Sequence, residues 1–134
     1  MVKQISTKSI QKNEYKNYQD KGKQFFDVML ICLQDGEWDA VLLNGIHACI
    51  SFNDAITTLY LGKRSSGKAH QDCAHLLLQA LSSTEAKRNA DRLIEIINLK
   101  NLVEYEPRRF TQDAAHDFAK KVERFTSWAQ TVLV

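Results

Sequence analysis

The chain has 134 residues, of which 44% are hydrophobic, and its 18 basic and 16 acidic side chains leave a net charge of +2. This length predicts one globular domain over residues 1–134, and the presence of only one proline and five glycines predicts few, long elements. No run approaches the ~18 apolar residues of a membrane span, and the polar N-terminus lacks an apolar signal core, so a cytoplasmic location is expected.

The N-terminal part of the chain is basic. The first 24 residues hold six lysines against two acidic residues, a balance of +4, which leaves −2 for the remainder. This asymmetry indicates an anionic partner. Residues 1–11 are predicted to form a less ordered extension. Lys8, Lys12 and Lys16 recur at four-residue steps, which is typical of a solvated helix face or, as the less favoured alternative, of a face that contacts nucleic acid.

Two long helices follow this extension. Apolar residues recur at three- and four-residue steps over residues 12–34 and again over residues 37–61, which predicts two amphipathic helices. Gly36 and Gly62 follow them and supply the left-handed residue that commonly ends a helix.

The second half of the chain continues this helical pattern. A third helix is predicted over residues 69–81, and Ser82-x-x-Glu85 has the spacing of a capping box that begins a fourth helix reaching Ile97. Pro107 makes residues 98–110 a connection, and Thr111 caps a last helix. Because no segment alternates like a strand, the predicted fold is an all-α, up-and-down antiparallel bundle of four to five helices.

The connection at residues 62–70 reads GKRSSGKAH and is one residue short of a phosphate-binding loop. Ala69 stands where a hydroxyl should hold magnesium, and a helix instead of a strand precedes the loop, which argues against a nucleoside triphosphatase. The remaining interpretations are a basic turn without a ligand, or a site for a phosphate of RNA or of a nucleotide. The candidate residues of that site are Lys63, Arg64, Lys68 and His70.

No metal site or other cofactor is expected. The histidines and cysteines between residues 47 and 75 lack the close paired spacing of a structural zinc centre. Cys32, Cys49 and Cys73 are widely spaced within apolar sequence, which predicts buried thiols and no disulfide framework.

Two stretches carry a family resemblance. They are FFDVMLICLQDGEWDAVLLNGIHACISFNDAITTLYLG and NLVEYEPRRFTQDAAHDFAKKVERFTSWAQTVL. In order and character they resemble the HEPN domain (higher eukaryotes and prokaryotes nucleotide-binding), over residues 18–133. The resemblance implies an all-α bundle, a homodimer, and association with RNA, with nucleotides or with a partner nucleotidyltransferase antitoxin of a toxin–antitoxin pair.

Many active HEPN members are metal-independent ribonucleases that use an arginine and a histidine with four to six residues between them. Histidine moves the proton of the ribose 2′-hydroxyl and arginine stabilises charge on the phosphate. When the motif is anchored on Tyr105, its two positions fall on Asn98 and Val103, so the pair is missing there. Arg109 and His116 offer another pair at a fitting spacing, although exposed residues meet this spacing by chance.

Three functions therefore remain open. The preferred one is a non-catalytic HEPN-like bundle that binds RNA, a nucleotide or a partner protein. The second is a ribonuclease toxin that acts through Arg109 and His116. The third is an adaptor bundle that binds no nucleic acid.

Overall fold

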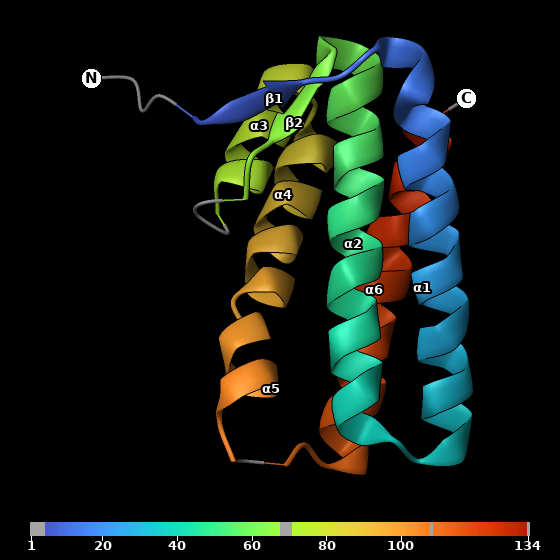
Figure 1. Cartoon of the computed structure of the whole chain (residues 1–134). Helices are drawn as coiled ribbons and strands as arrows, with labels where there is room; N and C mark the ends of the chain where they lie inside the picture. Colours follow the sequence, from blue (N-terminus) through green and yellow to red (C-terminus); the bar gives the residue numbers. More distant parts are fainter. Residues whose placement is uncertain (1–4, 68–70, 108, 134) are drawn as a thin grey trace.

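The structure, a computed structural model, describes residues 5–67, 71–107 and 109–133. Long helices stand roughly side by side, and a small two-stranded sheet lies beside α2 near one end of the bundle (Figure 1). The elements in chain order are β1 (Thr7–Ser9), the 3-10 turn η1 (Lys12–Glu14), α1 (Tyr15–Asp35), α2 (Trp38–Leu61), β2 (Lys63–Ser65), α3 (Asp72–Ala80), α4 (Thr84–Ile97), α5 (Lys100–Tyr105) and α6 (Gln112–Val132).

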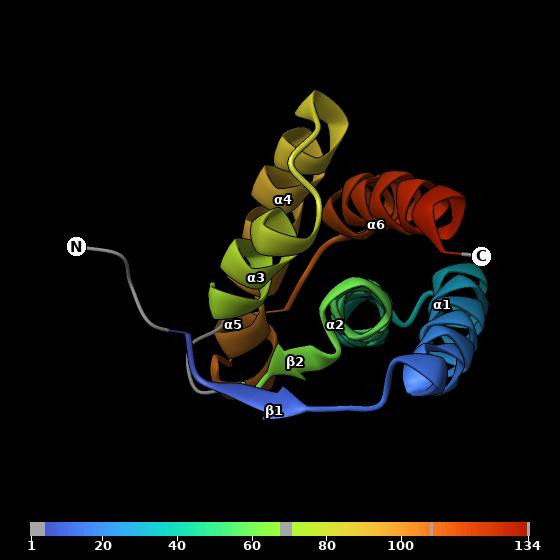
Figure 2. The same cartoon turned by 90° about the horizontal axis from the view of Figure 1, so that it is seen from above.

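Helix α2 lies at the centre of the molecule. Seen along its axis, α2 is surrounded by α1, α6 and the layer of α3, α4 and α5 (Figure 2). This position explains its sequence, which is apolar nearly all round: a helix with neighbours on every side has little surface to show to water. Its fully buried side chains include Val41, Leu42, Ile46, Phe52 and Ile56. The predicted all-α bundle is confirmed.

The helix ends follow local chemistry. Gly36 and Gly62 end α1 and α2 with φ of 77° and 68°, the left-handed conformation predicted for both. Thr111 accepts a hydrogen bond from the Ala114 N–H at 3.1 Å, so it is the predicted cap of α6. The cap of α4 differs from the prediction. Ser83, and not Ser82, accepts from the Ala86 N–H at 3.0 Å, so α4 begins one residue later.

Three short elements differ from the sequence prediction. Residues 7–9 of the expected extension pair antiparallel with residues 63–65, Lys8 opposite Arg64, and three-residue strands are too short for alternation to be recognised. The predicted connection contains helix α5, where Leu102 and Val103 pack against the core.

None of the helices in the described part of the chain combines the length and hydropathy needed to cross a membrane.

Candidate functional site

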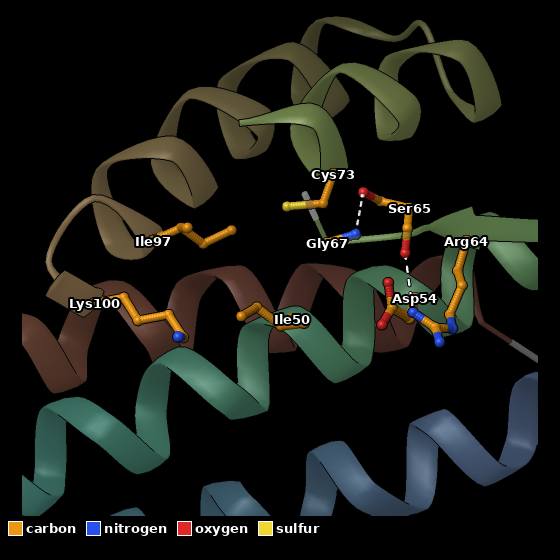
Figure 3. A pocket seen from close by; sticks show the side chains of 8 residues that line it. All are labelled: Ile50, Asp54, Arg64, Ser65, Gly67, Cys73, Ile97 and Lys100. Carbon is orange, nitrogen blue, oxygen red and sulfur yellow. Dashed lines mark hydrogen bonds between the residues drawn. The ribbon is translucent and has the colours of Figure 1, made fainter. Parts of the chain in front are cut away.

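A pocket of about 190 Å³ lies between α2, β2 and the layer formed by α3, α4 and α5 (Figure 3). Its walls combine apolar side chains with charged ones. They are formed by Ile50, Asp54, Arg64, Ser65, Gly67, Cys73, Ile97 and Lys100.

Strand β2 brings Arg64 and Ser65 to this pocket. The chain leaves α2 through the left-handed Gly62 and is held extended by β1, with the Ile10 N–H donating to the Gly62 carbonyl at 2.9 Å. Ser65 is buried, and its Oγ accepts from the Gly67 N–H at 3.3 Å, which turns the chain away after the strand. The pocket edge is therefore built on the N-terminal strand as well as on the bundle.

Arg64 lines the pocket, and the described residues satisfy its guanidinium only in part. Its Nη1 donates to the Ser65 carbonyl at 3.0 Å. Its Nε is buried and has no acceptor among the described residues. Buried donors are normally satisfied, and an unsatisfied one costs ~1–3 kcal/mol, so a ligand acceptor that reaches this guanidinium would be favoured.

Asp54 faces the same pocket from α2. Burial raises the pKa of its carboxyl to about 7, while the positive charges of Arg64 and Lys21 act in the opposite direction. Within the described part of the chain the carboxylate makes no hydrogen bond and no ion pair with N···O of 4.0 Å or less. In Figure 3 it lies beside the Arg64 guanidinium, without a contact drawn between them. The Asp54 carboxyl therefore combines a raised pKa with the absence of a hydrogen-bond donor among the described residues.

Cys73 forms an apolar wall. Burial, and then the charge of Asp54, raises the pKa of its thiol to about 12, so the thiol stays protonated and is a poor nucleophile. Next to Asp54 in the sequence, Asn53 is fully buried and its Nδ2 donates to the Cys73 carbonyl at 2.9 Å. This bond fixes the start of α3 against α2 and so keeps the pocket wall in place.

Lys100 closes the far end of the pocket. Its Nζ contacts Glu104 Oε2 at 3.1 Å, one turn further along α5. The pKa of His47, one turn before Ile50 on α2, is lowered by burial and then by the charge of Lys100. The His47 ring lies 5.4 Å from the Phe25 ring, centroid to centroid. This end of the pocket thus holds a lysine that is paired with an acidic residue of its own helix.

The predicted catalytic pair lies at the end of the bundle remote from the sheet, where the α1–α2 turn meets the start of α6 (Figure 1). Arg109 lines a second pocket of about 330 Å³ together with Trp38, and the His116 ring lies 5.9 Å from the Trp38 ring. The Phe110 N–H donates to Asp39 Oδ1 at 2.9 Å, which links the connection before α6 to the start of α2. Both members of the pair are exposed.

The predicted phosphate residues are partly placed. Arg64 lines the first pocket, Lys63 is its neighbour on β2 and is not among the lining residues, and Lys68 and His70 lie outside the described residues. The predicted common helix face of Lys8, Lys12 and Lys16 is wrong, because Lys8 lies on β1, Lys12 on η1 and Lys16 on α1.

Sequence reasoning missed Asp54 and Lys100. A signal for Asp54 was present: it is an acidic residue in the middle of a helix whose pattern predicts burial, and a buried carboxyl calls for a functional explanation. No comparable signal exists for Lys100, because nothing in the sequence distinguishes it from the other lysines.

Comparisons with known proteins add no identification. The chain matches no protein-family model and no curated protein sequence. Among the described residues, no three histidine, cysteine, aspartate or glutamate side chains are grouped so that they could hold a metal ion.

Proposed function

We propose that the protein is a HEPN-like helical bundle that binds a nucleotide, without catalysis, at the pocket between α2 and β2. The observation that carries the proposal is Arg64, a guanidinium at a concave site with a buried Nε that no described residue accepts from. Arginine binds phosphate through paired N–H donors, which suits a phosphate placed at this edge.

The size of the pocket limits what it holds. Pockets that bury a whole drug-sized ligand measure ~300–1,000 Å³, and this one measures about 190 Å³. It therefore takes one part of a nucleotide, a base or a sugar phosphate, while the rest stays at the rim. A single nucleotide of an RNA strand is held in the same way.

Calorimetric titration of the purified full chain with nucleoside monophosphates tests the proposal. Arg64→Gln should weaken binding about tenfold or more, since hydrogen bonds to charged groups are worth ~1.5–3 kcal/mol. Lys63→Gln is the matched control: it removes one charge from the neighbouring residue of β2, which does not line the pocket. Equal losses in both variants, or no binding at millimolar nucleotide, would contradict the proposal and favour an adaptor bundle.

A second candidate function is a metal-independent ribonuclease toxin acting through Arg109 and His116. The observation that favours it is Trp38, which lines a pocket with Arg109 and lies against the His116 ring. RNA cleavage in EDTA that is lost in His116→Ala and kept in His75→Ala, an exposed histidine of α3, would establish it. In that case a partner nucleotidyltransferase antitoxin is the expected inhibitor.

We further propose that the protein is a homodimer formed through α1. Lys21, Gln24, Val28, Ile31 and Asp35 lie on one exposed stripe of that helix. Val28 and Ile31 are 41% and 57% exposed, unusually high for such side chains. If two copies pair antiparallel about Val28, Lys21 meets Asp35 of the partner subunit, which joins an apolar centre to complementary charged ends.

This dimer should be weak, because one helix face supplies less than the ~1,200–2,000 Å² of a standard interface. In sedimentation velocity experiments Ile31→Glu should abolish a concentration-dependent dimer. Leu30→Glu is the matched control, because Leu30 is 45% exposed but points away from this stripe. A dimer that survives Ile31→Glu would contradict this interface.

The three cysteines form no disulfide, which fits the reducing cytoplasm, where we place the protein.

A further inference from the structure

The inference concerns what the pocket selects, and it rests on the proposed nucleotide binding. Asp54 and Arg64 present opposite charges to the same small space (Figure 3). Three apolar side chains, Ile50, Cys73 and Ile97, form the remaining walls. A ligand that fits such a site has an anion, flat apolar faces and an edge of hydrogen-bond donors.

Among the residues that the structure describes, none donates a hydrogen bond to the Asp54 carboxylate. The charged and titratable groups that act on it among the described residues are Lys21 from α1, Arg64 from β2 and Cys73 from α3. Neither Lys21 nor Arg64 forms an ion pair with it at an N···O distance of 4.0 Å or less. Lys100, at the other end of the pocket, is paired with Glu104 on its own helix. The acceptor capacity of Asp54 is therefore available to a ligand.

We propose that Asp54 selects the guanine base of the bound nucleotide by accepting two parallel hydrogen bonds from its N1–H and N2–H groups. An ionised carboxylate offers two acceptors side by side and no donor. The Watson–Crick edge of guanine presents two adjacent donors, whereas the edges of adenine, cytosine and uracil each place an acceptor against one carboxylate oxygen. Ile50 and Ile97 line the space for the base, and the phosphate stays at the rim of the pocket.

Discrimination of this kind is large, because a mismatched edge leaves a buried polar group unpaired. We expect GMP to bind the full chain at least tenfold more tightly than AMP, CMP or UMP. Because only the ionised carboxylate accepts both hydrogen bonds, GMP affinity should increase from pH 6 to pH 8.

Asp54→Asn tests the assignment directly. Its amide places a donor against one of the two guanine donors, so GMP affinity should fall at least tenfold, the preference over AMP should disappear, and the pH dependence should flatten. Asp117→Asn, at an exposed position of α6, is the matched control and should leave all four affinities unchanged. Asp54→Ala, which removes both acceptors without adding a donor, should lose the same preference and guards against misfolding of one variant.

The possible outcomes separate the two proposals. Binding of all four nucleotides with similar affinity, unaffected by Asp54→Asn, would overturn the guanine assignment and leave nucleotide binding intact. Preference for another base would overturn it as well. Binding of no nucleotide would overturn both.

Discussion

Asp54 makes the stability of the fold depend on pH. Its pKa is about 7 in the folded protein against an ordinary value of 3.8, chiefly because of burial. Below pH 3.8 the carboxyl is protonated in both states and carries no penalty. As the pH rises toward 7 the unfolded chain ionises first, so the free energy of unfolding decreases across this range. A shift of three pKa units corresponds to at most ~4 kcal/mol, and partial exposure reduces this amount.

Asp54→Asn should remove this dependence. At pH 8 the variant is expected to be more stable than the natural protein by about 2 kcal/mol, and at pH 4 the two should be nearly equal, because the amide never ionises. Urea unfolding at several pH values measures both. The exposed Asp117→Asn variant should keep the natural pH dependence. If Asp54→Asn changes stability equally at pH 4 and pH 8, the carboxyl titrates normally.

The cap of α4 can be tested at two adjacent serines. Ser83→Ala should lower the free energy of unfolding by ~1 kcal/mol, because it leaves the Ala86 N–H without its acceptor. Ser82→Ala, one residue earlier, should change it by less than ~0.5 kcal/mol. Thermal unfolding of both variants makes the measurement. A larger loss at Ser82 would place the helix start where the sequence pattern first predicts it.

At the scale of elements, Gly45 sets how closely α2 approaches its neighbours. A Cβ built at this position would lie 2.5 Å from Phe118 Cε2 on α6 and 2.9 Å from Met29 Sδ on α1. Gly45→Ala should therefore destabilise the protein by ~1–3 kcal/mol, although alanine is favoured over glycine in helices by ~1 kcal/mol. Urea unfolding checks this, with the exposed Ser127→Ala on α6 as control. A neutral or stabilising effect would show that α1 and α6 can move apart.

The long helices could be predicted from the sequence and the short elements could not. The helices that became α1, α2 and α6 repeat their apolar pattern over more than twenty residues, so local spacing determines them. In contrast, β1 exists because residues 7–9 meet residues 63–65 across the fold, and α5 because Leu102 and Val103 reach the core. The pocket residues differ in the same way. Arg64 could be predicted from its local motif, whereas Asp54 and Lys100 come close to Arg64 only because the helices pack together.

At the scale of the whole molecule, the N-terminal strand and the pocket are coupled. Strand β1 pairs with β2, which carries Arg64 and Ser65. Two further hydrogen bonds, each 2.9 Å long, extend the ladder at its ends: the Ile10 N–H donates to the Gly62 carbonyl, and the Ser66 N–H donates to the Ser6 carbonyl. The buried helical core contains no side chain from β1. Removal of β1 should therefore affect the pocket more than it affects the bundle.

Deletion of residues 1–9 tests this coupling. Without its partner, β2 loses the bonds that hold it extended, so Arg64 is less well positioned and nucleotide affinity should fall about tenfold. The helical circular dichroism signal should be retained, because the apolar contacts among α1, α2, α4 and α6 remain. Deletion of residues 1–5, which keeps Ser6 and β1, is the matched control and should bind as the natural protein does. Unchanged affinity after the longer deletion would mean that Gly62 and the Ser65–Gly67 turn alone hold the pocket edge, whereas loss of the helical signal would mean that β1 supports the bundle itself.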